Sequence, residues 1–210
     1  TNVAWRLVEQ ARNACIQAKR DGDLSVRLYV EHQRQDALNQ FKLEQKLYRA
    51  IQLDQLHVVF QPQYSLDTNQ LVGAEALVRW TDGEGIVHPP SEFIPVAAEC
   101  GLLAKITAFV LRRVLALQQA LLADQVVPVP IAINVAPVEF QSEHFVKTLI
   151  QCVHEHQVPQ NLIEIEITED SLLNRDEVTM RNIDELRQLG IEISLDDFGV
   201  GYSSLNYLRY

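Results

Sequence analysis

Four polar side chains stand within or at the ends of strand-like stretches, and together they could bind a metal ion. They are Glu75, Asn134, Glu166 and Asp196. Carboxylate and amide oxygens are hard ligands, which suit Mg²⁺ or Mn²⁺ better than zinc. If Asp196 faces a cation from its strand, then Asp197, on the turn that follows, would bind the same cation or a second one.

The two-residue period of a β-strand divides each of these stretches into an apolar face and a polar face. In IEIEIT, at 163–168, isoleucines alternate with Glu164, Glu166 and Thr168. Three further stretches divide in the same way and carry the other polar residues, at 73–80, 131–136 and 191–197. An open doubly wound sheet buries both faces in apolar layers, whereas the strand ends of a (β/α) barrel converge on one mouth. The pattern therefore favours a barrel.

Each signal has a simpler explanation when it is taken alone. IEIEIT is typical of an amphipathic edge strand with solvated glutamates. The Asp196–Asp197 pair fits a turn after a strand, where aspartate is common for backbone reasons. Asn134 alone would fit a hydrogen-bonded core amide. Only the repetition of the pattern on four successive strands favours a shared site.

The rest of the chain supplies alternating strands and helices, which predicts an α/β fold with a largely parallel sheet. Strands are expected at 57–64, 71–80, 129–136, 162–168 and 191–197. Helices are expected from a cap at Ser91 to Gly101, over 105–123 and 139–156, and over the stretch that ends at Gly190. The histidines match no ligand spacing on a strand end, so surface or helix positions are expected for residues 57, 88, 144, 154 and 156.

Composition excludes several classes of protein. The 210 residues are 47% hydrophobic with a net charge of −10, which argues against a binder of polymeric nucleic acid or of anionic membranes. Three distant cysteines fit a reducing compartment and no zinc site. No apolar run suggests a membrane span or a signal peptide. The chain begins at Thr1 rather than Met, so the parent protein could still be membrane-anchored upstream.

The first thirty residues have a different organisation from the remainder. A helix is expected over 3–20 and a short strand over 24–30, which cannot bury a core by themselves. We therefore expect residues 1–30 to be the tail of another domain, 31–56 to be a linker helix, and 57–210 to form the main domain.

Six motifs in order along the chain resemble the EAL-domain cyclic-di-GMP phosphodiesterases. They are FQPQY at 60–64, EALVRW at 75–80, PPSEFIPVAAECGLL at 89–103, INVAP at 133–137, EITED at 166–170 and DDFGVGYSSL at 196–205. Residues 1–30 resemble more weakly the last helix and strand of a GGDEF domain. The GGDEF signature loop is not present in them, so no cyclase activity is assigned.

The resemblance implies a TIM-like (β/α) barrel with an antiparallel first strand, and hydrolysis of cyclic-di-GMP to linear pGpG in bacterial signalling. It implies two Mg²⁺ or Mn²⁺ ions, held by Glu75, Asn134, Glu166, Asp196 and Asp197. Of these, Glu75, Asp196 and Asp197 are implied to be catalytic. Substrate contacts are implied for Gln61, Leu77 and Arg79. Glu169 is also implied to be catalytic, through steadying the loop after the aspartate pair.

The sequence departs from the family pattern at a few positions. Ala136 stands where Ser is usual and Val200 where Thr is usual, and modest effects are expected from both. After Tyr210 the family continues with a strand carrying a Lys-Ile-Asp motif, a second-metal glutamate and a loop glutamine. With about five of the eight barrel strands, the 210 residues are expected to form an incomplete barrel and to be inactive or only weakly active.

A second interpretation is a regulatory module that binds cyclic-di-GMP without cleaving it. Degenerate members of that kind usually lose the glutamate of EAL or the aspartate pair, and this chain retains both, which favours the enzyme. An unrelated metal-dependent barrel enzyme is the third interpretation, and it would require six accidental motif matches. A homodimer and an upstream GGDEF or sensor domain are the expected protein partners.

Overall fold

The structure is a computed structural model that describes residues 8, 11–12, 31–168, 171 and 176–196. The chain divides into two compact units, Thr1–Arg49 and Ala50–Tyr210. Helix α2, Glu31–Gln52, begins in the first unit and ends in the second. The expected helix at 3–20 and strand at 24–30 lie almost entirely outside the described residues. The second unit carries all the described candidate site residues.

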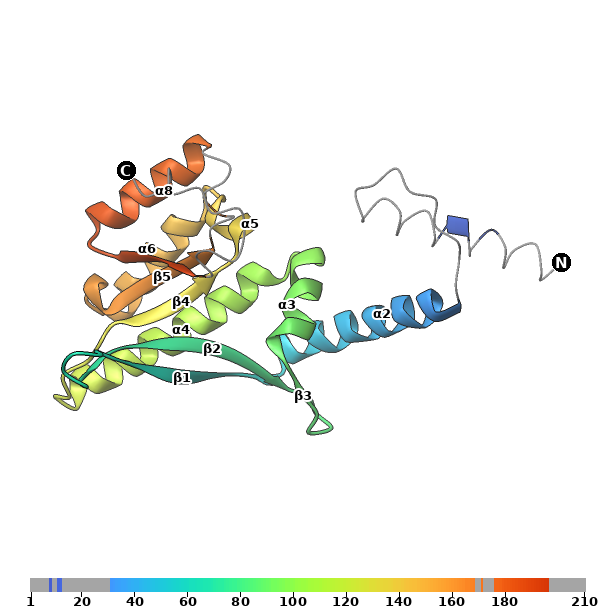
Figure 1. Ribbon diagram of the computed structural model, residues 1–210, viewed down its shortest axis with the longest axis horizontal. Coiled ribbons are helices and arrows are strands. Elements are labelled where there is room, and N and C mark those ends of the chain that lie inside the picture. The colour runs from blue at the N-terminus through green and yellow to red at the C-terminus, as the bar shows by residue number, and fades with distance from the viewer. Residues whose placement is uncertain (1–7, 9–10, 13–30, 169–170, 172–175, 197–210) are drawn as a thin grey trace. The chain divides into compact units, whose positions relative to one another are not determined.

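Six strands in the described part of the second unit form one mixed sheet in the order β1-β2-β4-β5-β6, with β3 paired to β2 (Figure 1). The strands are β1 (Leu56–Tyr64), β2 (Leu71–Thr81), β3 (Val87–His88), β4 (Ile131–Val135), β5 (Ile163–Thr168) and β6 (Glu192–Asp196). β1 is antiparallel to β2, whereas β2, β4, β5 and β6 are parallel. The expected antiparallel first strand and parallel remainder are confirmed, and the described barrel is incomplete.

Helices follow the strands as an α/β fold requires. They are α3 (Pro90–Glu99), α4 (Leu103–Ala123), α5 (Pro137–Phe140), α6 (Phe145–His156), the 3₁₀ helix η1 (Gln160–Leu162) and α8 (Glu177–Gln188). α4 contacts β1, β2 and β4, α8 contacts β6, and α6 contacts both α4 and α8. The parallel strands thus have a helical layer over one face (Figure 1).

Two helix predictions require correction. The cap of α3 is Pro89 and not Ser91, because Pro90 at the first helical position needs no partner for an N–H and already has a helical φ. The expected helix over 139–156 is two helices, α5 and α6, separated by residues 141–144. The break between them forms part of the cavity described below.

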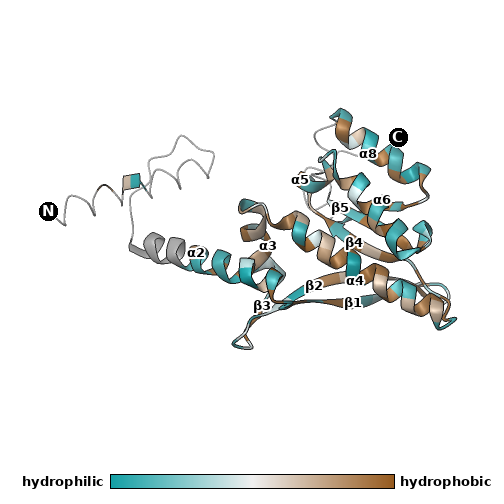
Figure 2. Cartoon of the chain, turned by 180° about the vertical axis from the view of Figure 1, so that it is seen from behind, coloured by the Kyte–Doolittle hydropathy of each residue, from teal (hydrophilic) through white to brown (hydrophobic). Residues whose placement is uncertain are grey.

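The core lies between the sheet and this helical layer. Ile163, Ile165 and Ile167 of β5 are buried, and so are Ile131 and Ile133 of β4. α4 packs against β4 with a buried face made of Ile106, Val110, Leu111, Val114 and Leu115. Figure 2 shows this helix as mostly hydrophobic. The alternation read from the sequence therefore assigns the apolar faces of β4 and β5 correctly, and leaves their polar faces directed away from α4.

Helix α4 is, among the described residues, the one helix that is long and apolar enough to cross a membrane by length and composition alone. One face of it is buried against β1, β2 and β4. Arg112 and Arg113 are exposed on the helix surface. A core helix that covers a sheet has this same composition.

His88 does not lie on the surface or in a helix, as the sequence had suggested, but is buried on β3. Its Nε2 lies 3.2 Å from Asp82 Oδ2 and its Nδ1 lies 3.2 Å from Glu92 Oε2. Its ring stacks on Trp80 at 4.0 Å between centroids. These contacts attach the β2–β3 hairpin to α3, which is a structural role.

Replacing Asp176 by Ala should lower the melting temperature of the chain by about 2–4 °C near neutral pH. Asp176 caps α8 by accepting a hydrogen bond from the Thr179 backbone N–H at 2.7 Å, which lowers the pKa of its carboxyl. A lowered pKa means that the stabilisation is present above the ordinary value of 3.8 and is lost in more acidic solution. Thermal unfolding of both forms should therefore differ at pH 7 and converge on acidification. An equal difference at both pH values would contradict the capping role.

Candidate functional site

Glu75 lies in the middle of β2 and connects two neighbouring strands. In the antiparallel pair it lies opposite Gln61 of β1. Its Oε1 accepts a hydrogen bond from Asn134 Nδ2 of β4 at 2.7 Å. The structure therefore brings together two of the predicted metal ligands and one predicted substrate contact.

The strand register sets the other two predicted ligands in order. Asn134 lies opposite Glu166 of β5, and Glu166 lies opposite Ser194 of β6. Glu75 lies opposite Ala132, two residues before Asn134, and Asp196 lies two residues beyond Ser194. The four side chains thus share the polar face of the sheet in a staggered row, as expected for strands that tilt around a barrel axis.

Glu166 has the most perturbed environment in this row. Its Oε2 is buried and has no hydrogen-bond partner within the described structure. Its pKa is raised to about 7, first by burial and then by the negative charges of Glu75, Asp196 and Glu164. A carboxylate in this position is destabilised because both desolvation and like charges oppose ionisation. A bound cation would satisfy the free oxygen and offset the repulsion, so the donor set fits a divalent metal.

The described residues do not form a closed metal cluster. No three acids, histidines or cysteines in the described part of the chain come close enough to hold a metal ion. The amide oxygen of Asn134, which can also bind a metal, is not one of these three residue classes. Asp197, a predicted ligand, and Glu169, the predicted loop-positioning residue, lie outside the described residues.

The remaining predicted substrate contacts follow Glu75 along β2. Leu77 and Arg79 are half-buried on the same side of the strand, two and four residues beyond it. Arg79 Nη1 donates to the backbone carbonyl of Val78 at 2.9 Å. Arg79 therefore stands towards the carboxyl end of β2, where a guanidinium would be placed to meet an anionic ligand.

Sequence reasoning missed Ser194 as a site residue. Its Oγ is buried without a hydrogen-bond partner among the described residues, and it lies opposite Glu166. The signal was available, since the alternation in 191–197 places Ser194 on the polar face with Asp196. Serine is a weaker metal ligand than a carboxylate, so its residue type alone does not indicate a metal site.

Comparison with known proteins places this geometry in a family. The EAL domain family matches residues 44–210. Signaling protein YkoW of Bacillus subtilis is 34% identical over 97% of this chain and 25% of its own length. Cyclic di-GMP phosphodiesterase PdeR of Escherichia coli is 30% identical over 96% of this chain and 30% of its own length. The chain thus spans between a quarter and a third of the length of these two relatives.

A solved structure agrees with the sequence match. The PaMucR phosphodiesterase, in complex with c-di-GMP, superposes with a TM-score of 0.75 at 28% identity, covering 80% of this chain and 68% of that one. The superposition shows that the two chains share the same mixed α/β fold. The chain is therefore a member of the EAL domain family.

Proposed function

We propose that the protein is a metal-dependent phosphodiesterase that hydrolyses cyclic-di-GMP to linear pGpG. One observation supports this most directly. The Glu166 carboxylate has a buried oxygen without a partner and lies beside further negative charge, as a cation-binding group would before its ion binds. The names of PdeR and of the PaMucR complex agree with this substrate class.

Each residue of the row has a role in this reaction. Glu75, Asn134, Glu166 and Asp196 hold one Mg²⁺ or Mn²⁺, and Asp196 with Asp197 contributes to a second. Bound ions of this kind stabilise negative charge that develops on a phosphodiester. Asn134 orients the Glu75 carboxylate through the 2.7 Å hydrogen bond.

The substrate is held by a different set of residues. Gln61, Leu77 and Arg79 contact the dinucleotide, with Arg79 near its phosphate. Glu169 positions the segment that carries the aspartate pair. Water adds to one phosphorus, the bond from that phosphorus to a ribose 3′ oxygen breaks, and the proton from water goes to the leaving oxygen. One ring opening of this kind gives the linear product.

A second candidate is a regulatory module that binds cyclic-di-GMP without cleaving it. The PaMucR structure is a complex with c-di-GMP, and a related domain that holds the dinucleotide fits this function as well. In such a module Gln61 and Arg79 would bind the dinucleotide, and the acidic row would have only a structural role. The two functions make opposite predictions for turnover.

The domain organisation remains part of the proposal. Residues 57–210 would form the EAL domain, 31–56 a linker helix and 1–30 the tail of a GGDEF-like domain in a longer cytoplasmic protein that forms a homodimer. Limited proteolysis should then cut preferentially within 31–56, and cleavage spread evenly over 57–210 would contradict this division.

Metal titration followed by a hydrolysis assay tests the proposed function. Mg²⁺ or Mn²⁺ should raise the melting temperature of the 210-residue chain, and EDTA should reverse the rise. The product of the complete gene should convert cyclic-di-GMP to pGpG, measured by HPLC, only when metal is present. Tight binding of the dinucleotide with no turnover in any metal would instead establish the regulatory module.

A further inference from the structure

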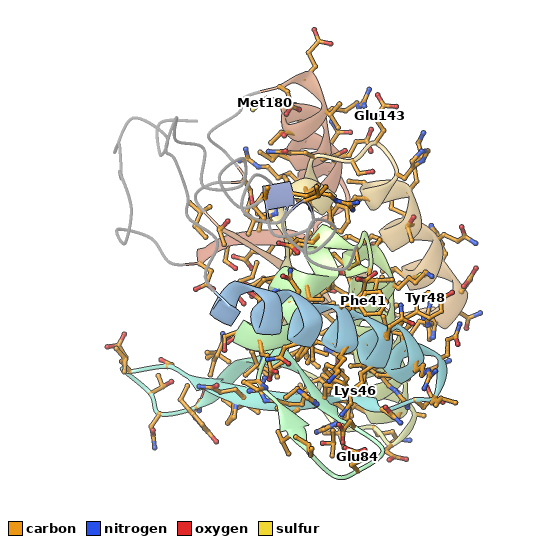
Figure 3. All side chains as sticks on the ribbon, turned by 90° about the vertical axis from the view of Figure 1, so that its right-hand side faces the viewer. Phe41, Lys46, Tyr48, Glu84, Glu143 and Met180 are labelled. Carbon is orange, nitrogen blue, oxygen red and sulfur yellow. The ribbon has the colours of Figure 1, made fainter. Side chains whose placement is uncertain are left out.

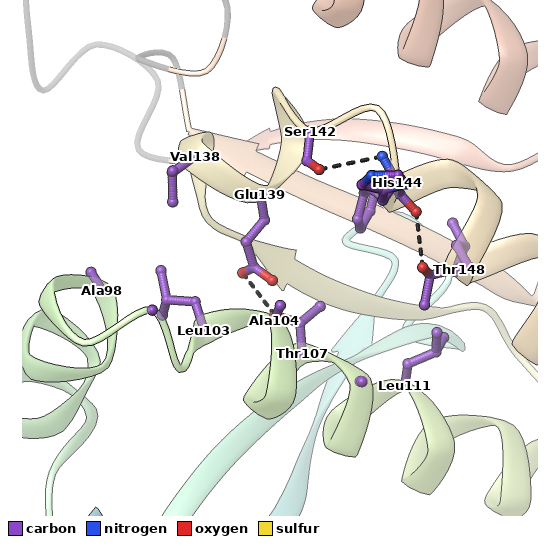
Figure 4. A pocket seen from close by; sticks show the side chains of 14 residues that line it. Ala98, Leu103, Ala104, Thr107, Leu111, Val138, Glu139, Ser142, His144 and Thr148 are labelled. Atoms are coloured by element: carbon purple, nitrogen blue, oxygen red, sulfur yellow. Dashed lines mark hydrogen bonds between the residues drawn. The ribbon is translucent and has the colours of Figure 1, made fainter. Parts of the chain in front are cut away.

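A cavity lies in the helical layer, away from the polar face of the sheet. It has a volume of about 310 Å³ and lies between the first half of α4 and the segment formed by α5 and the start of α6 (Figure 4). Its walls are mostly apolar and include Leu103, Ala104, Leu111, Phe145 and Leu149. None of the predicted metal or substrate residues lines it.

One acidic side chain is set into this apolar wall. Glu139, on α5, lines the cavity and faces Thr107 of α4, whose Oγ1 donates to Glu139 Oε2 at 2.9 Å (Figure 4). Burial raises the pKa of the carboxyl, and the hydrogen bonds from the Thr107 hydroxyl and the Ala136 backbone oppose that rise. No Lys or Arg forms an ion pair with Glu139 in the part of the chain that the structure describes. A half-buried carboxylate with one hydroxyl and one backbone partner retains unused acceptor capacity, because its two oxygens offer about four acceptor sites.

The dimensions and chemistry of the cavity define a ligand class. Small-molecule sites are typically concave, at roughly 300 Å³ or more, and combine apolar walls with a few polar groups that fix orientation. An apolar cavity of about 150 Å³ accommodates benzene, so this one has room for a ring and a short chain. A positive group at the end of that chain would complement Glu139 in a low-dielectric setting.

We propose that this cavity is a binding site for a small apolar amine, whose hydrocarbon part packs between α4 and α6 and whose ammonium pairs with Glu139. The site is independent of the phosphodiesterase proposal, because it uses neither the acidic row nor the dinucleotide. It lies against α5, which begins three residues after Asn134. The ligand is thus identified by its class, an ammonium group attached to a small hydrocarbon.

Binding of 2-phenylethylamine to the full 210-residue chain tests the proposal. The amine should raise the melting temperature and show saturable binding by calorimetry at millimolar concentration near neutral pH. Its neutral isostere 2-phenylethanol and the anionic 3-phenylpropanoate should each bind at least about tenfold more weakly, since each lacks the charge-assisted hydrogen bond.

Three variants locate the effect. Glu139→Gln removes the charge at nearly constant shape and should weaken amine binding about tenfold. Ala104→Phe projects a larger side chain from exposed Ala104 into the cavity and should abolish binding of all three probes. Glu143→Gln is the matched control, because Glu143 is exposed, pairs with Arg181 at 3.2 Å and does not line the cavity (Figure 3). It should bind the amine like the unmodified chain.

Several results would overturn the proposal. No saturable amine binding by the unmodified chain would exclude the site. Equal binding of the amine and the alcohol, or unchanged binding in Glu139→Gln, would remove the role of the carboxylate. Stronger binding of the propanoate would assign the cavity to an anion. If Ala104→Phe fails to fold, amide shifts caused by the amine must map to α4 and α6 in the unmodified chain, and shifts elsewhere would reject the location.

Discussion

Replacing Glu75 by Gln should lower the rate of cyclic-di-GMP hydrolysis by at least about a thousandfold in the product of the complete gene. The substitution keeps the length of the side chain but removes one negative charge from the row. The amide oxygen of glutamine can still accept the Asn134 hydrogen bond, now 2.7 Å long, but its NH2 group replaces the second carboxylate oxygen and cannot bind a cation. Both effects weaken metal binding at the centre of the site. Turnover is measured by HPLC at saturating Mn²⁺.

A matched variant separates this effect from a general loss of acidity. Glu84 lies on the turn between β2 and β3, outside the row (Figure 3). Glu84→Gln makes the same chemical change and should retain full activity. If Glu75→Gln kept more than about a tenth of the activity, Glu75 would not be a metal ligand in the proposed reaction. Binding of the dinucleotide should be measured in parallel, so that lost affinity is distinguished from lost turnover.

The sheet could be predicted from the sequence because its strands alternate so regularly. In β5 the isoleucines are buried and the acids between them are not, as the two-residue period requires. In β6 the same alternation predicts burial less well, because Ile193 and Leu195 are only half-buried in the described structure. An edge strand has a neighbour on one side only, so its pattern says less about burial.

The details that depend on neighbouring segments could not be predicted. Helix α3 begins at Pro90, although Ser91 is by residue type the better capping residue. The buried position of His88 depends on Asp82, Trp80 and Glu92 together, and no single spacing in the sequence indicates that cluster. Local propensity describes single elements, whereas these features arise from packing between them.

For the site, the sequence supplied residue types and the structure supplied their relative positions. Alternation placed Glu75, Asn134, Glu166 and Asp196 on one face, but it could not give the stagger between β2 and β4. Register depends on packing across strands, because a shift by two residues preserves the faces while moving every partner. The buried unpartnered oxygen of Glu166 follows from this register and was invisible in the sequence.

Replacing Glu166 by Gln should stabilise the metal-free chain above neutral pH while abolishing its response to metal. The pKa of Glu166 is raised from 4.5 to about 7, so folding favours the protonated form. Stability from this group is therefore fully present below pH 4.5 and is lost as the pH rises through 7. At pH 8 the ionised carboxylate should cost on the order of 1–2 kcal/mol, after allowance for solvent screening. The uncharged glutamine avoids this cost.

Two measurements on the unmodified chain and Glu166→Gln test whether the carboxylate lowers stability but is needed for metal binding. In EDTA, Glu166→Gln should melt above the unmodified chain at pH 8 and at nearly the same temperature at pH 5. With Mn²⁺ at pH 8 the order should reverse, because only the carboxylate gains a ligand bond. Glu164→Gln, two residues earlier on the same strand, is the control and should keep the metal response. A variant at 166 that is less stable in EDTA at pH 8, or that still responds to Mn²⁺, would show that this carboxylate is structural rather than poised for a cation.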